Sequence, residues 1–177
     1  MLPVLITLSA LAGATGCHVG AMLAITHSAL DQGPYRAETL AAELGPGSVR
    51  TLGCLDLGIV LYERNGKDLV DVHVGNRCGY PERLDLGKLA IRGTDPAGNT
   101  REVSLYDPKG EVVPLHVGGA QRGRERFRID DARDMRTVCF DLDRAAPDAP
   151  AAHPPPLCFD RPTGFRPTPG TWTTREV

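Results

Sequence analysis

The chain has 177 residues, which is enough for one domain with extensions at its ends. Apolar residues make up 41% and charged residues 24%, an ordinary balance for a globular protein that excludes a fully disordered chain or one with many membrane spans. The formal net charge of -2 provides no positive field that would gather phosphates, so we expect no nucleic-acid partner.

The first thirty residues have the character of a targeting segment. They contain no Asp, Glu, Lys or Arg, and residues 2–14 form an apolar run suited to the core of a signal peptide. This run leads into the tetrapeptide ATGC, ending at Cys17, which resembles the lipobox of bacterial lipoproteins. The resemblance implies a signal peptide over residues 1–16 and a lipid anchor on Cys17. The alternatives are a signal peptide cut after Ala14 or further on, an uncleaved anchor up to Leu30, and a cytosolic protein.

Beyond the targeting segment, residues 17–50 are expected to form a linker with one short helix. Helix-forming residues occupy positions 34–44, and the following Gly-Pro-Gly is a strong stop signal. From residue 51 the apolar residues alternate with polar ones, which predicts a strand to about Leu61. Asn65-Gly66 then favours a hairpin turn into a second alternating segment.

The remaining strands are predicted from the same alternation. Residues 84–91 form a strand whose spacing slips at Gly87, and four further strands follow, centred near residues 104, 114, 127 and 140. About seven short strands over residues 51–143 predict an all-β antiparallel β-sandwich, for which an immunoglobulin-like topology is our first choice. The Pro-rich residues 144–177 predict an extended C-terminal tail.

Four cysteines remain once Cys17 is set aside: Cys54, Cys78, Cys139 and Cys158. An even number without a C-x-x-C pair indicates two disulfides, with four free buried thiols as the alternative. Disulfides persist in oxidising compartments, so this interpretation agrees with export. Three connectivities are possible, and we prefer Cys78 with Cys139 and Cys54 with Cys158, which would tie the tail to the first strand.

A row of arginines is the most distinctive surface feature of the sequence. Alternation with other residues places all four side chains on one face of a strand: Arg122, Arg124, Arg126 and Arg128. These side chains could bind anionic lipid heads or an acidic envelope protein, because guanidinium groups match oxyanions. We favour a simpler role, in which the charges protect an edge strand from pairing with other chains.

Few residues are arranged as a catalytic or metal site would require. Neighbouring strands could bring Asp71, His73 and His116 together in a metal-dependent or hydrolytic site. Three acidic residues of one loop, Asp130, Asp131 and Asp134, could bind calcium, although adjacent arginines are their more natural partners. The sequence contains no G-x-S-x-G, P-loop or H-E-x-x-H motif. We therefore expect no catalytic residue, metal or cofactor.

Together these features predict a non-enzymatic, lipid-anchored, disulfide-bonded β-sandwich of the cell envelope. It would lie in the periplasm, at the outer membrane or on the cell surface, held by its lipid anchor. We expect it to act as a binding or structural module, with an envelope protein as a candidate partner. The alternative is an enzyme with a site near Asp71, His73 and His116.

Overall fold

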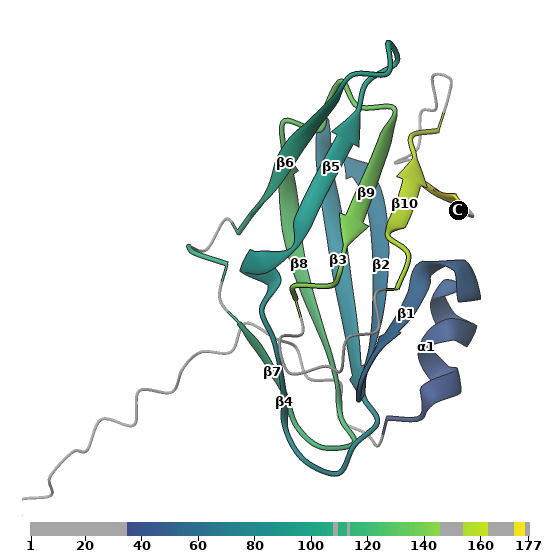
Figure 1. Cartoon of the computed structure of the whole chain (residues 1–177), viewed down its shortest axis with the longest axis vertical. Coiled ribbons are helices and arrows are strands. Elements are labelled where there is room, and N and C mark those ends of the chain that lie inside the picture. Colours follow the sequence, from purple (N-terminus) through teal and green to yellow (C-terminus); the bar gives the residue numbers. More distant parts are fainter. Residues whose placement is uncertain (1–34, 108–109, 113, 146–153, 163–171, 176–177) are drawn as a thin grey trace, which may run out of the picture.

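The computed structural model describes residues 35–107, 110–112, 114–145, 154–162 and 172–175 (Figure 1). These residues form eleven strands, one α-helix and two short 3-10 helices. In chain order the elements are α1 Ala37–Leu44, η1 Pro46–Ser48, β1 Val49–Leu52, β2 Leu55–Arg64, β3 Lys67–Asn76, β4 Glu82–Leu84, η2 Leu86–Lys88, β5 Ala90–Thr94, β6 Thr100–Tyr106, β7 Leu115–Val117, β8 Arg122–Asp130, β9 Thr137–Asp141, β10 Leu157–Asp160 and β11 Thr173–Arg175.

Nine of the described strands belong to one antiparallel sheet. Its order is β1-β2-β3-β8-β6-β5-β9-β10-β11, while β4 and β7 form a separate two-stranded sheet. The hairpin predicted at Asn65-Gly66 is confirmed. Both turn residues have positive φ, 54° and 70°, and β2 pairs with β3 along its whole length, from Arg64↔Lys67 outward.

The sheet curls because β6 changes partners along its length. Its first half pairs with β5, ending at Ile91↔Val103, and its second half pairs with β8, starting at Ser104↔Asp130. A strand that changes partners in this way turns a sheet corner. As a result, β5, β6 and β9 lie in front of β2, β3 and β8 in Figure 1. The curl brings the residue before β11 back beside β2, where the backbone N–H of Trp172 donates to the Leu61 carbonyl at 2.8 Å.

The core fills the space inside the curled sheet. Alternate residues of β2 and β3 are fully buried there: Leu57, Ile59, Leu61, Val70, Val72 and Val74. The opposite wall contributes Phe140 and Phe159, whose rings meet edge to face with centroids 5.8 Å apart. Each fully buried side chain of this kind stabilises the fold by about 1.5 to 3 kcal/mol. The hydrophobic interior therefore favours the curled shape over a flat sheet.

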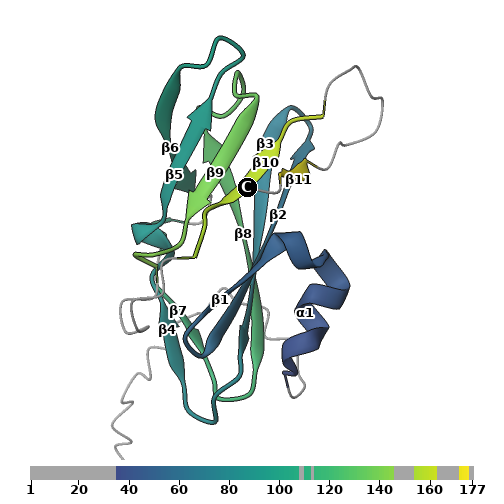
Figure 2. The ribbon, with the colours of Figure 1, turned by 45° about the vertical axis from the view of Figure 1, so that its right-hand side comes forward.

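Helix α1 covers one end of the outer face of β2 and β3 (Figure 2). Leu40 of this helix is buried against Gly58, where an added Cβ would collide with the helix side chains. The Tyr35 ring lies on Gly75 in the same way, and its hydroxyl donates to Asp56 at 2.9 Å. Burial and this hydrogen bond raise the pKa of Tyr35 above its ordinary value. The two glycines thus allow the close approach of the segment predicted as a helix.

The predicted fold is correct in class and wrong in detail. The described residues form a mostly antiparallel β structure, but with eleven strands in a curled sheet and a small second sheet, and not as a seven-stranded immunoglobulin-like sandwich. The strand predicted over residues 84–91 is divided into β4, η2 and β5. The slip in spacing at Gly87 therefore marks a 3-10 turn between two sheets.

The tail predicted to be extended contributes β10 and β11 to the main sheet. Its prolines leave room for two short strands, since Leu157–Asp160 and Thr173–Arg175 contain none. At the other end of the sheet, β1 begins at Val49 and pairs with β2. The β structure of the described residues thus extends on both sides of residues 51–143.

Both disulfides exist, but the preferred pairing was wrong. The bonds are Cys54–Cys78 and Cys139–Cys158. Cys54 precedes β2 and Cys78 follows β3, so the register of that hairpin brings them together. Cys139 and Cys158 lie directly opposite each other on β9 and β10. The first disulfide therefore links the segments beside the open end of the β2–β3 hairpin, the second joins β9 to β10, and neither connects the tail to the first strand.

Candidate functional site

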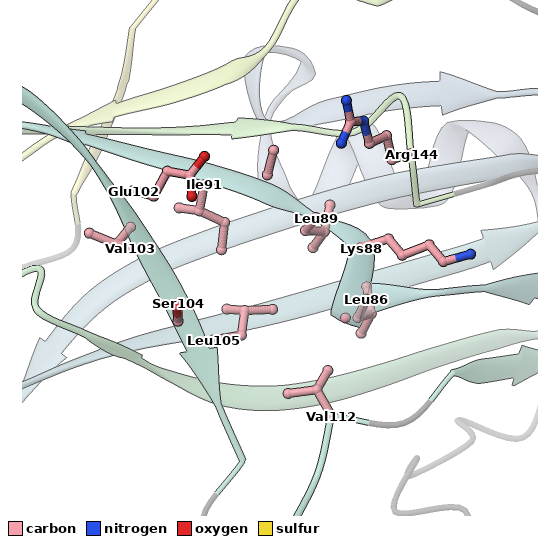
Figure 3. Close-up of a pocket in the computed structure, with 12 residues that line it drawn as sticks. Leu86, Lys88, Leu89, Ile91, Glu102, Val103, Ser104, Leu105, Val112 and Arg144 are labelled. Atoms are coloured by element: carbon pink, nitrogen blue, oxygen red, sulfur yellow. The ribbon is translucent and has the colours of Figure 1, made fainter.

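A cavity of about 730 Å³ opens beside the point where β6 changes partners. We call it the β5–β6 cavity; it is formed by η2, the start of β5, the middle of β6 and three residues between elements. Half of the twelve lining residues that the structure describes have large aliphatic side chains: Leu86, Leu89, Ile91, Val103, Leu105 and Val112 (Figure 3). Its volume lies within the range of roughly 300 to 1,000 Å³ that is typical of small-ligand sites.

The pairing of β6 explains why the cavity exists. β5 and β6 are paired from Thr94↔Thr100 to Ile91↔Val103, and beyond that point β6 leaves to pair with β8. The first residues of β5 and the preceding η2 therefore have no β6 partner, and a gap opens between the two walls. Gaps of this kind at the mouth of a curled sheet are common ligand sites.

Three aliphatic residues at the cavity differ from the rest of the core. Leu89, Leu105 and Val112 pack against the core but remain only half-buried. Leu86 and Ile91 of the same lining are 1% and 2% exposed, so aliphatic side chains form one part of the cavity wall beside its polar and charged residues. Removing such half-exposed apolar surface from water is favourable, at roughly 25 cal/mol per Å². Burial of these side chains by a ligand would therefore contribute favourable free energy to the binding of an apolar molecule.

The charged residues at the cavity are Lys88, Glu102 and Arg144. The Lys88 ammonium lies 3.6 Å from the Asp85 carboxylate, and Figure 3 shows its side chain running away from the aliphatic cluster. Glu102 stands directly opposite Arg92 in the β5–β6 register. Arg144 is exposed and forms no ion pair with the residues that the structure describes. Among the described residues, Glu102 and Arg144 are thus the two charged groups of the cavity without an ion pair.

The arginine row predicted from the sequence lies on one face of β8, as the burial pattern of the strand shows. β8 pairs with both β3 and β6, so the interpretation as an edge strand was wrong. The charges of the row are also compensated. Arg122 lies 2.7 Å from Glu43 on α1, and Arg128 lies 3.2 Å from Asp130. These ion pairs connect the row to the protein's own carboxylates.

The two central arginines of the row bind Asp71 on the neighbouring strand β3. Asp71 is 3% exposed, accepts hydrogen bonds from Arg126 at 2.6 and 3.0 Å, and accepts another from Arg124. Tyr62 completes the cluster, because its hydroxyl lies 3.4 Å from Asp71 and its ring lies under the Arg126 guanidinium. Burial opposes ionisation of Asp71, but the bonds from both arginines outweigh it and lower its pKa.

The residues of the alternative enzyme site are not brought together. His73 lies on β3 beside Asp71, where burial and then the Arg124 guanidinium lower its pKa. His116 lies on β7 in the separate sheet, opposite Arg83. Across residues 35–107, 110–112, 114–145, 154–162 and 172–175, no three His, Cys, Asp or Glu side chains are grouped to hold a metal. The three acidic residues considered as calcium ligands are among these described residues: Asp130, Asp131 and Asp134.

The predicted lipid site, Cys17, lies outside the described residues. Within the described part of the chain, no helix combines the length and the apolar character needed to cross a membrane.

The sequence analysis did not identify the residues of the β5–β6 cavity. One signal was present, namely the slip in apolar spacing at Gly87, which marks the turn that forms one wall. The other wall depends on the division of β6 between two partners, and alternation along a strand does not reveal its neighbours.

In comparisons with known proteins, no family model, no curated protein and no solved structure matches this chain. The candidate sites therefore stand on their own geometry.

Proposed function

We propose that this chain is a non-enzymatic, lipid-anchored binding module of the cell envelope that holds a small apolar ligand in the β5–β6 cavity. The observation that carries the proposal is the cavity itself, with about 730 Å³ of space and a partly aliphatic wall. Half-buried Leu89, Leu105 and Val112 would become fully buried by a ligand. Partly exposed apolar surface of this kind can mark a binding site, which agrees with the proposal.

The envelope location is supported by the two disulfides, Cys54–Cys78 and Cys139–Cys158. Such bonds form and persist in oxidising compartments. The lipobox-like tetrapeptide ending at Cys17 supplies the anchor in this proposal. Several acyl chains on one cysteine would hold the domain firmly at a membrane surface, whereas a single chain binds only weakly.

Binding can be tested with Nile red, a neutral apolar dye that becomes fluorescent in apolar surroundings. We expect the folded protein to bind the dye, and Leu105→Trp to weaken binding because the larger side chain occupies part of the cavity and covers the aliphatic surface beside it. The matched control is Leu69→Trp, since Leu69 is half-buried on the outer face of β3 and lies outside the cavity. Equal dye binding by Leu105→Trp and the wild type would overturn the proposed site.

The anchor can be tested separately by mass spectrometry of the mature N-terminus from bacterial membranes. The proposal predicts a diacylglyceryl modification on Cys17 as the first residue. An unmodified chain starting at Met1 would contradict the anchored form. Intact mass before and after reduction, in the same measurement, should differ by the four hydrogens of two disulfides.

A further inference from the structure

Two charged side chains of the β5–β6 cavity, Glu102 and Arg144, have no ion pair among the described residues, and this bears on which ligand would bind. Lys88 has Asp85 at 3.6 Å, whereas Glu102 stands opposite Arg92 in the strand register without an ion pair among the described residues. Arg144 also lines the cavity, but it forms no ion pair within the described residues. A ligand that brings an anion to Arg144 would therefore supply a missing partner.

The shape of the guanidinium group favours one kind of anion. Its parallel N–H groups match the two oxygens of a carboxylate, and such paired bonds are among the stronger hydrogen bonds in proteins. Arg144 is exposed, so its side chain can orient toward an incoming group without breaking a contact inside the protein. A carboxylate at this position would keep contact with water at the cavity entrance and lose little hydration.

The remainder of the ligand must match the aliphatic part of the cavity wall. Among the lining residues that the structure describes, none has an aromatic side chain on which a planar ring could stack. A flexible alkyl chain fits such a surface, because it can follow the irregular outline between Leu89, Leu105 and Val112. In Figure 3 Arg144 lies on the Leu89 side of this group, and Leu105 and Val112 lie farther from it in the view. The charged and apolar parts of the cavity are thus adjacent.

We infer that the β5–β6 cavity binds an alkyl carboxylate, with the carboxylate paired to Arg144 and the alkyl chain against Leu89, Leu105 and Val112. This inference rests on the proposed function, since it assigns the ligand class for the same cavity. The observation that carries it is the Arg144 guanidinium, which has no ion pair among the described residues, in the same cavity as an aliphatic cluster.

The test compares dodecanoate with dodecanol by isothermal titration calorimetry of the folded, oxidised protein, below the concentration at which either ligand aggregates. We expect dodecanoate to bind about five- to tenfold more tightly, because a charge-assisted hydrogen bond at an exposed site contributes on this scale. Arg144→Gln should remove the difference and leave dodecanol binding unchanged. The control Arg133→Gln, an exposed arginine outside the cavity, should keep the difference.

Chain length provides a second arm of the test. Each methylene added between octanoate and dodecanoate should tighten binding roughly fourfold while the chain still finds apolar surface in the cavity. Leu105→Trp should weaken the longer chains more than the shorter ones. An affinity that does not change with chain length would overturn the assignment of the alkyl chain to the aliphatic part of the cavity wall.

Two outcomes separate this inference from the proposed function. If Nile red and dodecanol bind in the cavity but dodecanoate binds no better, or dodecyltrimethylammonium binds more tightly, the inference is overturned and the apolar site remains. If none of these ligands binds, and Leu105→Trp changes nothing, both are overturned.

Discussion

Asp71 is a buried carboxylate on the outer face of a sheet, and its three partners hold it in place. With Arg124, Arg126 and Tyr62 around it, the group keeps its negative charge despite being 3% exposed. The cluster compensates the middle of the arginine row. Its role is therefore structural, and it couples β3 to β8 through side chains as well as through the backbone.

Replacing Asp71 with Asn should destabilise the protein by about 1 to 3 kcal/mol, because hydrogen bonds to a charged group are lost and two arginines face each other uncompensated. Chemical denaturation at pH 7 measures this change. The control is Asp134→Asn, an exposed carboxylate in a loop, which should change the free energy of unfolding little. Equal stability of the two variants would contradict the role given to Asp71.

The pKa of Asp71 is lowered from its ordinary 3.8, so its contribution to stability is present above that pH and is lost as the pH falls through the lower folded value. The Asn variant should lack this acid-dependent loss. Denaturation curves between pH 2 and pH 5 would show the difference between the two proteins narrowing toward the acid end. A constant difference over this range would contradict the assignment.

His73 titrates in a separate range. Burial and Arg124 lower its pKa below the ordinary 6.5, so the unfolded chain binds the proton more readily than the folded one. Stability from His73 is therefore complete above about pH 6.5 and declines as the pH falls toward the lower folded pKa. We expect His73→Gln to flatten the change in unfolding free energy between pH 5 and pH 7.5. An unchanged slope would show that His73 does not cause it.

At the scale of elements, the tail is held to the sheet by Arg161, which follows β10. Its guanidinium donates to Asp68 at 2.8 Å and to the Ala132 carbonyl at 2.8 Å, lies 3.3 Å from Glu63, and covers the Trp172 ring at 4.4 Å from its centroid. One side chain thus connects the β2–β3 hairpin, the loop before β9 and the tail. This connection explains how a Pro-rich segment can contribute two strands.

Arg161→Gln should destabilise the protein by about 3 kcal/mol, because Asp68 is 6% exposed and would remain as a buried carboxylate without its cation. Thermal denaturation measures the loss, and limited proteolysis should show faster cleavage within residues 144–177. The control is Arg136→Gln, because Arg136 is exposed and lies two residues before Val138 of β9. If both variants behave alike, Arg161 does not anchor the tail.

Local patterns in the sequence predicted the elements that depend on neighbouring residues. The Asn65-Gly66 hairpin and the alternation of β8 are correct because turn geometry and side-chain parity are local properties. The register of the same hairpin would also have predicted the first disulfide. Counting outward from the turn places Leu55 opposite Asn76, which leaves Cys54 next to Cys78.

The remaining features depend on contacts between distant residues, which alternation does not encode. Cys139 and Cys158 face each other only because β10 pairs with β9, and prolines around β10 concealed that strand. The β5–β6 cavity likewise depends on the change of partner by β6 at Ser104. Whether β8 is an edge or a central strand also follows from its neighbours and not from its own residues.

At the scale of the whole molecule, the two disulfides lie at separate places, one beside the open end of the β2–β3 hairpin and one between β9 and β10. Replacing both cysteines of either pair with Ser should cost about 3 kcal/mol, the value typical of loops near 20 residues. Peptide mapping without reduction should recover Cys54 joined to Cys78 and Cys139 joined to Cys158. Peptides joining Cys78 to Cys139 would contradict the fold.

The central claim is that the curl of the sheet creates a ligand site between β5 and β6. The most direct measurement is a two-dimensional ¹H–¹⁵N NMR titration of the folded protein with dodecanoate. We predict that the largest shift changes fall on the backbone amides of the cavity: Leu89, Ile91, Ser104, Leu105 and Arg144. Amides of the arginine row on β8, on the outer face, should change little. Shift changes centred on that row, or none at all, would contradict the account.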